Sequence, residues 1–155
     1  MNAAQSRSTS NTVIVSQLIP ASVDQVWSAW TVPSIKKRWW GRSENLELVL
    51  CEMDVRVGGN YRYGMAQHGS KDVLAAAHGV YQQVEPNHLL VYTWTWGGDA
   101  PLVKDTLVTV LFEELSGDQT RVTVTHERQP SAEVADIHQD GWTHMLADLV
   151  LHTRF

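Results

Sequence analysis

The fold is decided by two stretches in which apolar and hydroxylated residues alternate: residues 88–96, HLLVYTWTW, and residues 120–128, TRVTVTHER. In the first stretch Tyr92, Trp94 and Trp96 fall on one face of an extended strand, and threonines fall on the other. Alternation of this kind is typical of a β-strand with one face in a core and one face in solvent. The two stretches therefore predict strands whose large apolar side chains point the same way.

The same two-residue period extends outward from these stretches, and turn residues interrupt it at short intervals. The turns are GG at 58–59, the loop over residues 67–71, EPN at 85–87, residues 97–101 and SGD at 116–118. Connections of this length cannot hold a crossover helix, so neighbouring strands must run antiparallel. We expect a meander of six strands, to which a strand over residues 12–19 adds a seventh. The six strands are predicted at about residues 44–55, 59–65, 73–84, 88–96, 106–114 and 120–128.

Two short helices are predicted between the first strand and the meander. Ser22 and Gln25 have the spacing of a capping box, at the start of a helix that reaches Trp30. Pro33 interrupts the pattern, and residues 34–39 can form a second short helix. The chain thus begins as strand, helix, helix.

From Ser131 onward the sequence has the 3.6-residue period of one long helix. Its apolar face carries Val134, Ile137, Trp142, Met145, Leu146, Leu149 and Val150. Its opposite face carries Asp136, Asp140, His144, Asp148 and His152. The pattern predicts an α+β domain in which a seven-stranded antiparallel sheet wraps around this long C-terminal helix.

The composition indicates one globular domain. The 155 residues suffice for one domain of ordinary size, which we place at residues 12–155 after a disordered tail over residues 1–11. A net charge of −5 argues against a nucleic-acid partner. The single Cys51 cannot form an intramolecular disulfide, and we find neither a signal peptide nor an apolar run long enough to span a membrane. We therefore expect a cytoplasmic protein without membrane contact.

Seven tryptophans and four tyrosines are a large number for a domain of this size. One helix laid on a curved sheet does not fill the concave face, so a cavity is expected between them. The strand period directs most of the rings into that space, where their N–H and O–H groups suit a cavity with some polar content. A solid core filled by the same rings is the alternative. The candidate ligand-binding residues are Trp40, Tyr61, Tyr63, Tyr92, Trp94, Phe112, His126, Trp142 and Met145.

Five segments together resemble one known family. They are RWWG at residues 38–41, VGGNYRY at 57–63, LVYTW at 90–94, TRVTVTHE at 120–127 and GW at 141–142. In this order they resemble the homologue family of the heat-shock-protein-90 ATPase activator, in the START-like or helix-grip superfamily of polyketide cyclases and birch-pollen-allergen-like carriers. The resemblance covers about residues 12–152. It implies the helix-grip fold, and it implies binding of a small hydrophobic, lipid-like or aromatic ligand in the grip cavity.

Two other functions stay open at this stage. The same cavity could serve a cyclase-type or hydrolase-type enzyme, in which His126 and either Arg62 or Tyr92 polarise the substrate. The chain could also be a stress-response or interaction module that uses a sheet edge or the Trp39-Trp40 corner, including as a homodimer. Contact with a chaperone is kept only as an alternative, because eukaryotic co-chaperone members carry a second, chaperone-binding domain for which this chain has no matching region.

Several polar groups are expected to have structural roles. We expect His126 to be hydrogen-bonded within the core. His144 could share a metal with Asp148 or His152, but such spacing on a polar helix face is more typical of solvent contact, and no metal or other cofactor is predicted. Four basic residues near the second short helix are interpreted as its solvated end: Lys36, Lys37, Arg38 and Arg42.

Overall fold

The computed structural model describes residues 11–41, 45–97 and 101–152. The expected tail over residues 1–11 lies outside this part of the chain, apart from Asn11. The elements follow the predicted order of strand, two helices, six strands and a long helix. They are β1 (Val13–Ile19), α2 (Val23–Thr31), α3 (Pro33–Lys36), β2 (Leu46–Met53), β3 (Asn60–Gln67), β4 (Ala75–Glu85), β5 (Leu89–Gly97), β6 (Pro101–Ser116), β7 (Gln119–Glu127) and α4 (Ala132–His152).

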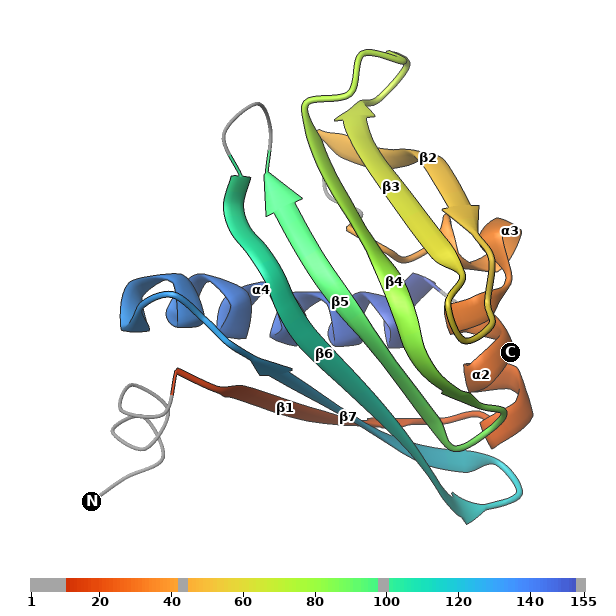
Figure 1. Ribbon diagram of the computed structural model, residues 1–155. Helices are drawn as coiled ribbons and strands as arrows, with labels where there is room; N and C mark the ends of the chain where they lie inside the picture. Colours follow the sequence, from red (N-terminus) through yellow and green to blue (C-terminus); the bar gives the residue numbers. More distant parts are fainter. Residues whose placement is uncertain (1–10, 42–44, 98–100, 153–155) are drawn as a thin grey trace.

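The strands form one sheet in the order β1-β7-β6-β5-β4-β3-β2, and every neighbouring pair is antiparallel. The meander is therefore confirmed, with β1 added beside β7 as the seventh strand. The sheet curls, α4 crosses its concave side, and α2 and α3 lie at one end (Figure 1). This is the helix-grip arrangement.

The start of α2 has the local structure that its sequence predicts. Ser22 is the N-cap, and its hydroxyl accepts a hydrogen bond of 3.2 Å from the backbone N–H of Gln25. The Gln25 side chain accepts in return from the Ser22 backbone N–H at 3.0 Å. This capping box satisfies two backbone donors that the helix itself cannot satisfy.

Two elements differ from their predicted bounds by three residues or more at one end. The second helix is a single turn that ends at Lys36, and the chain continues as turns through Gly41. Strand β6 begins at Pro101 rather than at residue 106, because a bulge in β6, which sets Lys104 and Asp105 opposite the single Thr95, lets pairing continue with Trp96 opposite Val103. The backbone N–H of Asp105, a residue with positive φ, donates to the hydroxyl of Thr95 and holds this irregular stretch.

The inner face of the sheet is the predicted one. The aromatic and branched side chains of β3, β5 and β7 are buried on this face, and the alternate side chains point outward. On α4, Trp142, Leu146 and Leu149 are buried as expected. The assignment of Ile137 to the buried face is wrong, because this side chain lies at the border of the helix stripe and is 49% exposed.

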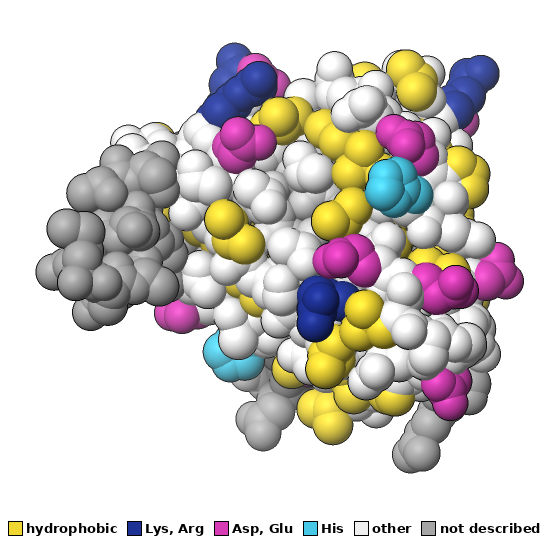
Figure 2. All heavy atoms as spheres, turned by 90° about the horizontal axis from the view of Figure 1, so that it is seen from below, with side chains coloured by type: hydrophobic (Ala, Val, Ile, Leu, Met, Phe, Trp, Pro, Cys, Tyr) yellow, Lys and Arg dark blue, Asp and Glu magenta, His cyan; other side chains and the backbone are white. Residues whose placement is uncertain are grey.

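The surface carries its exposed hydrophobic side chains in scattered positions. Figure 2 shows one face of the molecule, on which several small hydrophobic groups are separated by acidic, basic and histidine side chains. Ile14 and Leu18, on the outer face of β1, are among the exposed hydrophobic residues. Isolated exposure of this kind is normal for a globular protein.

Candidate functional site: an apolar pocket beneath the last helix

A pocket with a cavity of about 140 Å³ lies between α4 and the inner face of the sheet. None of the residues that line it, all of which belong to the described part of the chain, is an aspartate, glutamate, lysine or arginine. Its walls are therefore almost entirely apolar. The lining residues are Trp40, Gly41, Met65, Trp94, Trp96, Ile137, His138, Gly141, Trp142 and Met145.

Four parts of the chain build the pocket. Strand β3 contributes Met65, strand β5 contributes its tryptophans, α4 forms the opposite wall, and the turn after α3 closes one end with Trp40 and Gly41. Gly41 has a φ of 60°, and a Cβ added there would collide with the end of the Met65 side chain. The glycine therefore allows both the turn and the close approach of Met65.

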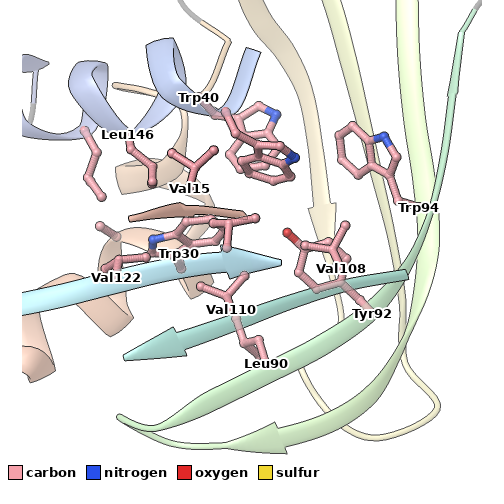
Figure 3. Close-up of a cluster of buried hydrophobic side chains, with 14 of the residues drawn as sticks. Val15, Trp30, Trp40, Leu90, Tyr92, Trp94, Val108, Val110, Val122 and Leu146 are labelled. Carbon is pink, nitrogen blue, oxygen red and sulfur yellow. The ribbon is translucent and has the colours of Figure 1, made fainter. Parts of the chain in front are cut away.

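Three tryptophans form a frame around the pocket. The ring centroids of Trp40 and Trp142 are 5.6 Å apart, those of Trp40 and Trp94 are 6.0 Å apart, and those of Trp94 and Trp142 are 6.1 Å apart. Figure 3 shows Trp40 and Trp94 pointing toward one another beneath α4. Tilted and edge-on contacts at such distances are the favourable ones for aromatic rings, so the frame is rigid.

The structure divides the predicted ligand-binding residues into two groups. Trp40, Trp94, Trp142 and Met145 line the pocket. The other five, Tyr61, Tyr63, Tyr92, Phe112 and His126, are buried but do not line it. Their rings pack against one another and against neighbouring rings, with centroids of Tyr61 and Tyr63 4.8 Å apart. These five side chains thus belong to the packed core, and the hollow lies beside Trp40, Trp94, Trp142 and Met145.

His126 lies inside the core with both ring nitrogens engaged. The indole N–H of Trp142 donates to Nδ1 at 3.1 Å, so Nδ1 carries the lone pair and Nε2 carries the proton. Nε2 donates to the hydroxyl of Thr106 at 2.7 Å, and that hydroxyl donates to the Trp94 carbonyl oxygen at 2.7 Å. Burial, together with a smaller contribution from nearby His138, lowers the pKa of His126 to about 2, so the ring stays neutral. The expectation of a core histidine is confirmed.

The three side chains of the enzymatic alternative are not brought together. Arg62 is exposed on the outer face of β3, where it pairs with Glu52 at 3.5 Å. Tyr92 and His126 are buried on the inner face. Because His126 already uses both nitrogens, it has none left to take a proton from a substrate.

Six of the lining residues were not among the predicted ligand-binding residues: Gly41, Met65, Trp96, Ile137, His138 and Gly141. Of these six, His138 brings polar ring nitrogens to the pocket. It is 8% exposed, lines the pocket and packs against His126 with ring centroids 4.5 Å apart. Burial lowers its pKa, although the bond to the Val134 carbonyl opposes this. The spacing 138, 142, 145, 146, 149 on α4 would have placed it on the buried face.

The interpretation of Lys36 as part of a solvated helix end is wrong. Lys36 is 1% exposed, and its ammonium group lies 4.0 Å from the ring centroid of Trp40 and 4.7 Å from that of Tyr63. Nζ also donates to the Trp30 carbonyl at 3.4 Å. Burial lowers the pKa of Lys36 to about 7, an effect that nearby Cys51 partly opposes. Arg42 lies outside the described residues.

The polar stripe of α4 has the character expected of it. His152 and Asp148 approach to 3.7 Å, and most residues of the stripe are exposed. Within residues 11–41, 45–97 and 101–152 no group of three or more histidine, cysteine, aspartate or glutamate side chains could hold a metal ion. In the same ranges no helix combines the length and the apolar character that crossing a bilayer requires.

A curled antiparallel sheet that grips one long helix, with an apolar pocket between them, defines a protein of the START-like superfamily. The sequence identifies the family within this superfamily: the profile of the family described as activator of Hsp90 ATPase homolog 1-like protein matches residues 20–152. The chain belongs to this family, which agrees with the resemblance in the five sequence segments.

Solved structures agree on the fold. Protein CV1439 from Chromobacterium violaceum is 25% identical with a TM-score of 0.74, and the match covers 91% of this chain and 95% of that one. CalU16 from Micromonospora echinospora is 27% identical with a TM-score of 0.64, over 91% and 74% of the two chains. The AHSA1-like protein from Aeromonas hydrophila is 22% identical with a TM-score of 0.73, over 90% and 91%. A search of curated proteins finds no match.

Proposed function

We propose that this protein binds a small, uncharged hydrophobic molecule in the pocket beneath α4. The observation that carries the proposal is a hollow of about 140 Å³ whose walls are aromatic and aliphatic and hold no charged side chain among the described residues. Removing apolar ligand surface from water favours binding in such a site. We expect the ligand to contact Trp40, Trp94, Trp142 and Met145. The other five predicted residues are buried in the core next to the pocket and do not line it.

The size of the hollow limits the part of the ligand that it encloses. Engineered apolar cavities of about 150 Å³ bind benzene, so this pocket holds about one six-membered ring. Burying about 200 Å² of apolar surface at about 25 cal/mol per Å² contributes about 5 kcal/mol before the cost of association. After that cost we expect a dissociation constant of about 1 mM or higher for a single ring. A larger molecule would have to extend beyond the hollow, and Ile137, a lining residue that is 49% exposed, offers it a surface outside.

Toluene is a suitable probe, because it is one uncharged ring without a polar group. We expect toluene to shift the indole N–H resonances of Trp40, Trp94 and Trp142 in nuclear magnetic resonance spectra, with saturable dependence on concentration. These three rings line the pocket, whereas Trp27 does not and serves as an internal reference.

Gly141→Leu is the variant that blocks the pocket. Gly141 lines the pocket within α4, and a Cβ added there meets nothing within 4 Å, so the helix can accept the new side chain. Ala147→Leu is the matched control, because Ala147 is exposed on the same helix and does not line the pocket. Toluene should shift the resonances in the wild type and in Ala147→Leu but not in Gly141→Leu. Equal binding to all three, or none to the wild type, would refute the proposal.

A further inference from the structure

Two nitrogen atoms in the walls of the pocket have no hydrogen-bond partner among the described residues. They are Nε2 of His138 and the indole Nε1 of Trp94. Both atoms are shielded from bulk water, and His138 and Trp94 are 8% and 4% exposed. Buried polar groups are normally paired, so two unpaired ones beside the same hollow require an explanation.

The chemical state of each nitrogen follows from its surroundings. Nδ1 of His138 lies 3.2 Å from the carbonyl oxygen of Val134, which can only accept, so Nδ1 carries the proton. Nε2 therefore carries a lone pair and is an acceptor. The indole nitrogen of Trp94 is a donor only. The pocket thus offers one acceptor, on α4, and one donor, on β5.

From this pair we infer that the pocket selects an uncharged, ring-sized molecule that bears a hydroxyl group, such as a phenol. A hydroxyl is the smallest group that donates and accepts at once: it can donate to Nε2 of His138 and accept from Nε1 of Trp94. The inference rests on the proposed function, and it adds the polar feature of the ligand.

The same geometry disfavours a carboxylate. A carboxylate only accepts, so it would face the lone pair of His138, and the walls provide no lysine or arginine to pair with it. The ammonium group of Lys36 lies 4.0 Å from the ring centroid of Trp40, and Lys36 does not line the pocket. Met65 and Met145 form part of the walls, and their flexible side chains let the walls adjust to a hydroxyl placed between the two nitrogens.

Phenol and toluene test the inference, because they have the same number of heavy atoms and differ in one group. In a pocket without polar partners, phenol binds more weakly than toluene by about fivefold to a hundredfold, since its hydroxyl is buried unpaired. In the wild type we expect phenol to bind at least as tightly as toluene, and benzoate to bind more weakly than either.

His138→Phe removes the acceptor and retains a ring of similar size. We expect toluene binding to persist in this variant, which shows that the pocket is intact, while phenol becomes at least fivefold weaker than toluene. His144→Phe is the matched control, because His144 is exposed on the same helix and does not line the pocket. Should His138→Phe fail to fold, Trp94→Phe removes the donor and the comparison in the wild type still decides.

The outcomes separate the two proposals. Toluene binding that Gly141→Leu blocks, together with a fivefold or greater preference for toluene over phenol in the wild type, overturns the hydroxyl inference and leaves the proposed function standing. Absence of binding by every compound overturns both. An unchanged ratio of phenol to toluene affinity in His138→Phe and Trp94→Phe also overturns the inference.

Discussion

Replacing the buried Lys36 by methionine should change how the stability of the protein depends on pH. In the folded protein the pKa of Lys36 is lowered to about 7 because the side chain is removed from water, against an ordinary value of 10.5. Between these values the unfolded chain binds more protons than the folded one, so the free energy of unfolding rises with pH. Below about pH 7 the folded protein carries the full cost of the buried charge.

The magnitude follows from the two pKa values. One pKa unit corresponds to about 1.4 kcal/mol. Between pH 6 and pH 9 the folded wild type loses the buried charge, and its free energy of unfolding rises by the equivalent of about two pKa units. Lys36→Met has no such group. The variant should therefore be more stable than the wild type at pH 6. The difference between their free energies of unfolding should fall by about 2–3 kcal/mol from pH 6 to pH 9.

Urea denaturation followed by circular dichroism at several pH values measures this difference. The pH range stays below the region in which the buried tyrosines titrate, since their pKa values are raised. Cys51 interacts with Lys36, so both proteins should also be compared in a Cys51→Ala background. A difference that stays flat from pH 6 to pH 9 would refute the reasoning. It would mean that the rings of Trp40 and Tyr63 compensate the ammonium for its lost water.

Three further changes test the fold. Thr106→Val removes the hydroxyl that accepts from Nε2–H of His126 and donates to the Trp94 carbonyl. It should lower the free energy of unfolding by about 1–3 kcal/mol in urea, whereas Thr109→Val on the same strand should not. Ser22→Ala removes the capping box and should cost about 1 kcal/mol; an unchanged melting temperature would contradict this role. Gly79→Ala places a Cβ against the Thr93 carbonyl oxygen and should lower the free energy of unfolding by about 1–3 kcal/mol. Gly117→Ala, with open space around its Cβ, should change it by less than about 0.5 kcal/mol.

Features that depend on neighbours in the sequence were predictable. The capping box needs only Ser22 and Gln25 at their spacing, and the inner face of β5 needs only the two-residue period that sets Tyr92 and Trp94 on one side. Short turns left antiparallel pairing as the only arrangement of the strands. The order of strands in the sheet could be predicted in the same way, because each antiparallel pair of the meander depends only on the short turn between two consecutive strands.

Features that depend on packing between distant elements were not predictable in this way. Lys36 stands in a run of basic residues that is typical of a solvated surface, yet Tyr63 from β3 joins the nearby Trp30 and Trp40, and the three rings lie around its ammonium group. The size of the pocket depends on how closely α4 approaches β5, which periodicity does not determine. His138 is a different case: it occupies the buried face of α4 although histidine is a polar residue type, so its position on the helix and not its residue type indicates its burial.

The pairing of β1 with β7 has a consequence for biosynthesis. Val13 lies opposite His126 and Ile19 lies opposite Thr120, so the first strand to leave the ribosome meets its neighbour about a hundred residues later. At roughly 5–20 residues per second, this strand waits on the order of 5–20 s with its apolar side chains uncovered. The domain is therefore most vulnerable to association with other nascent chains during translation, before α4 arrives to cover β1.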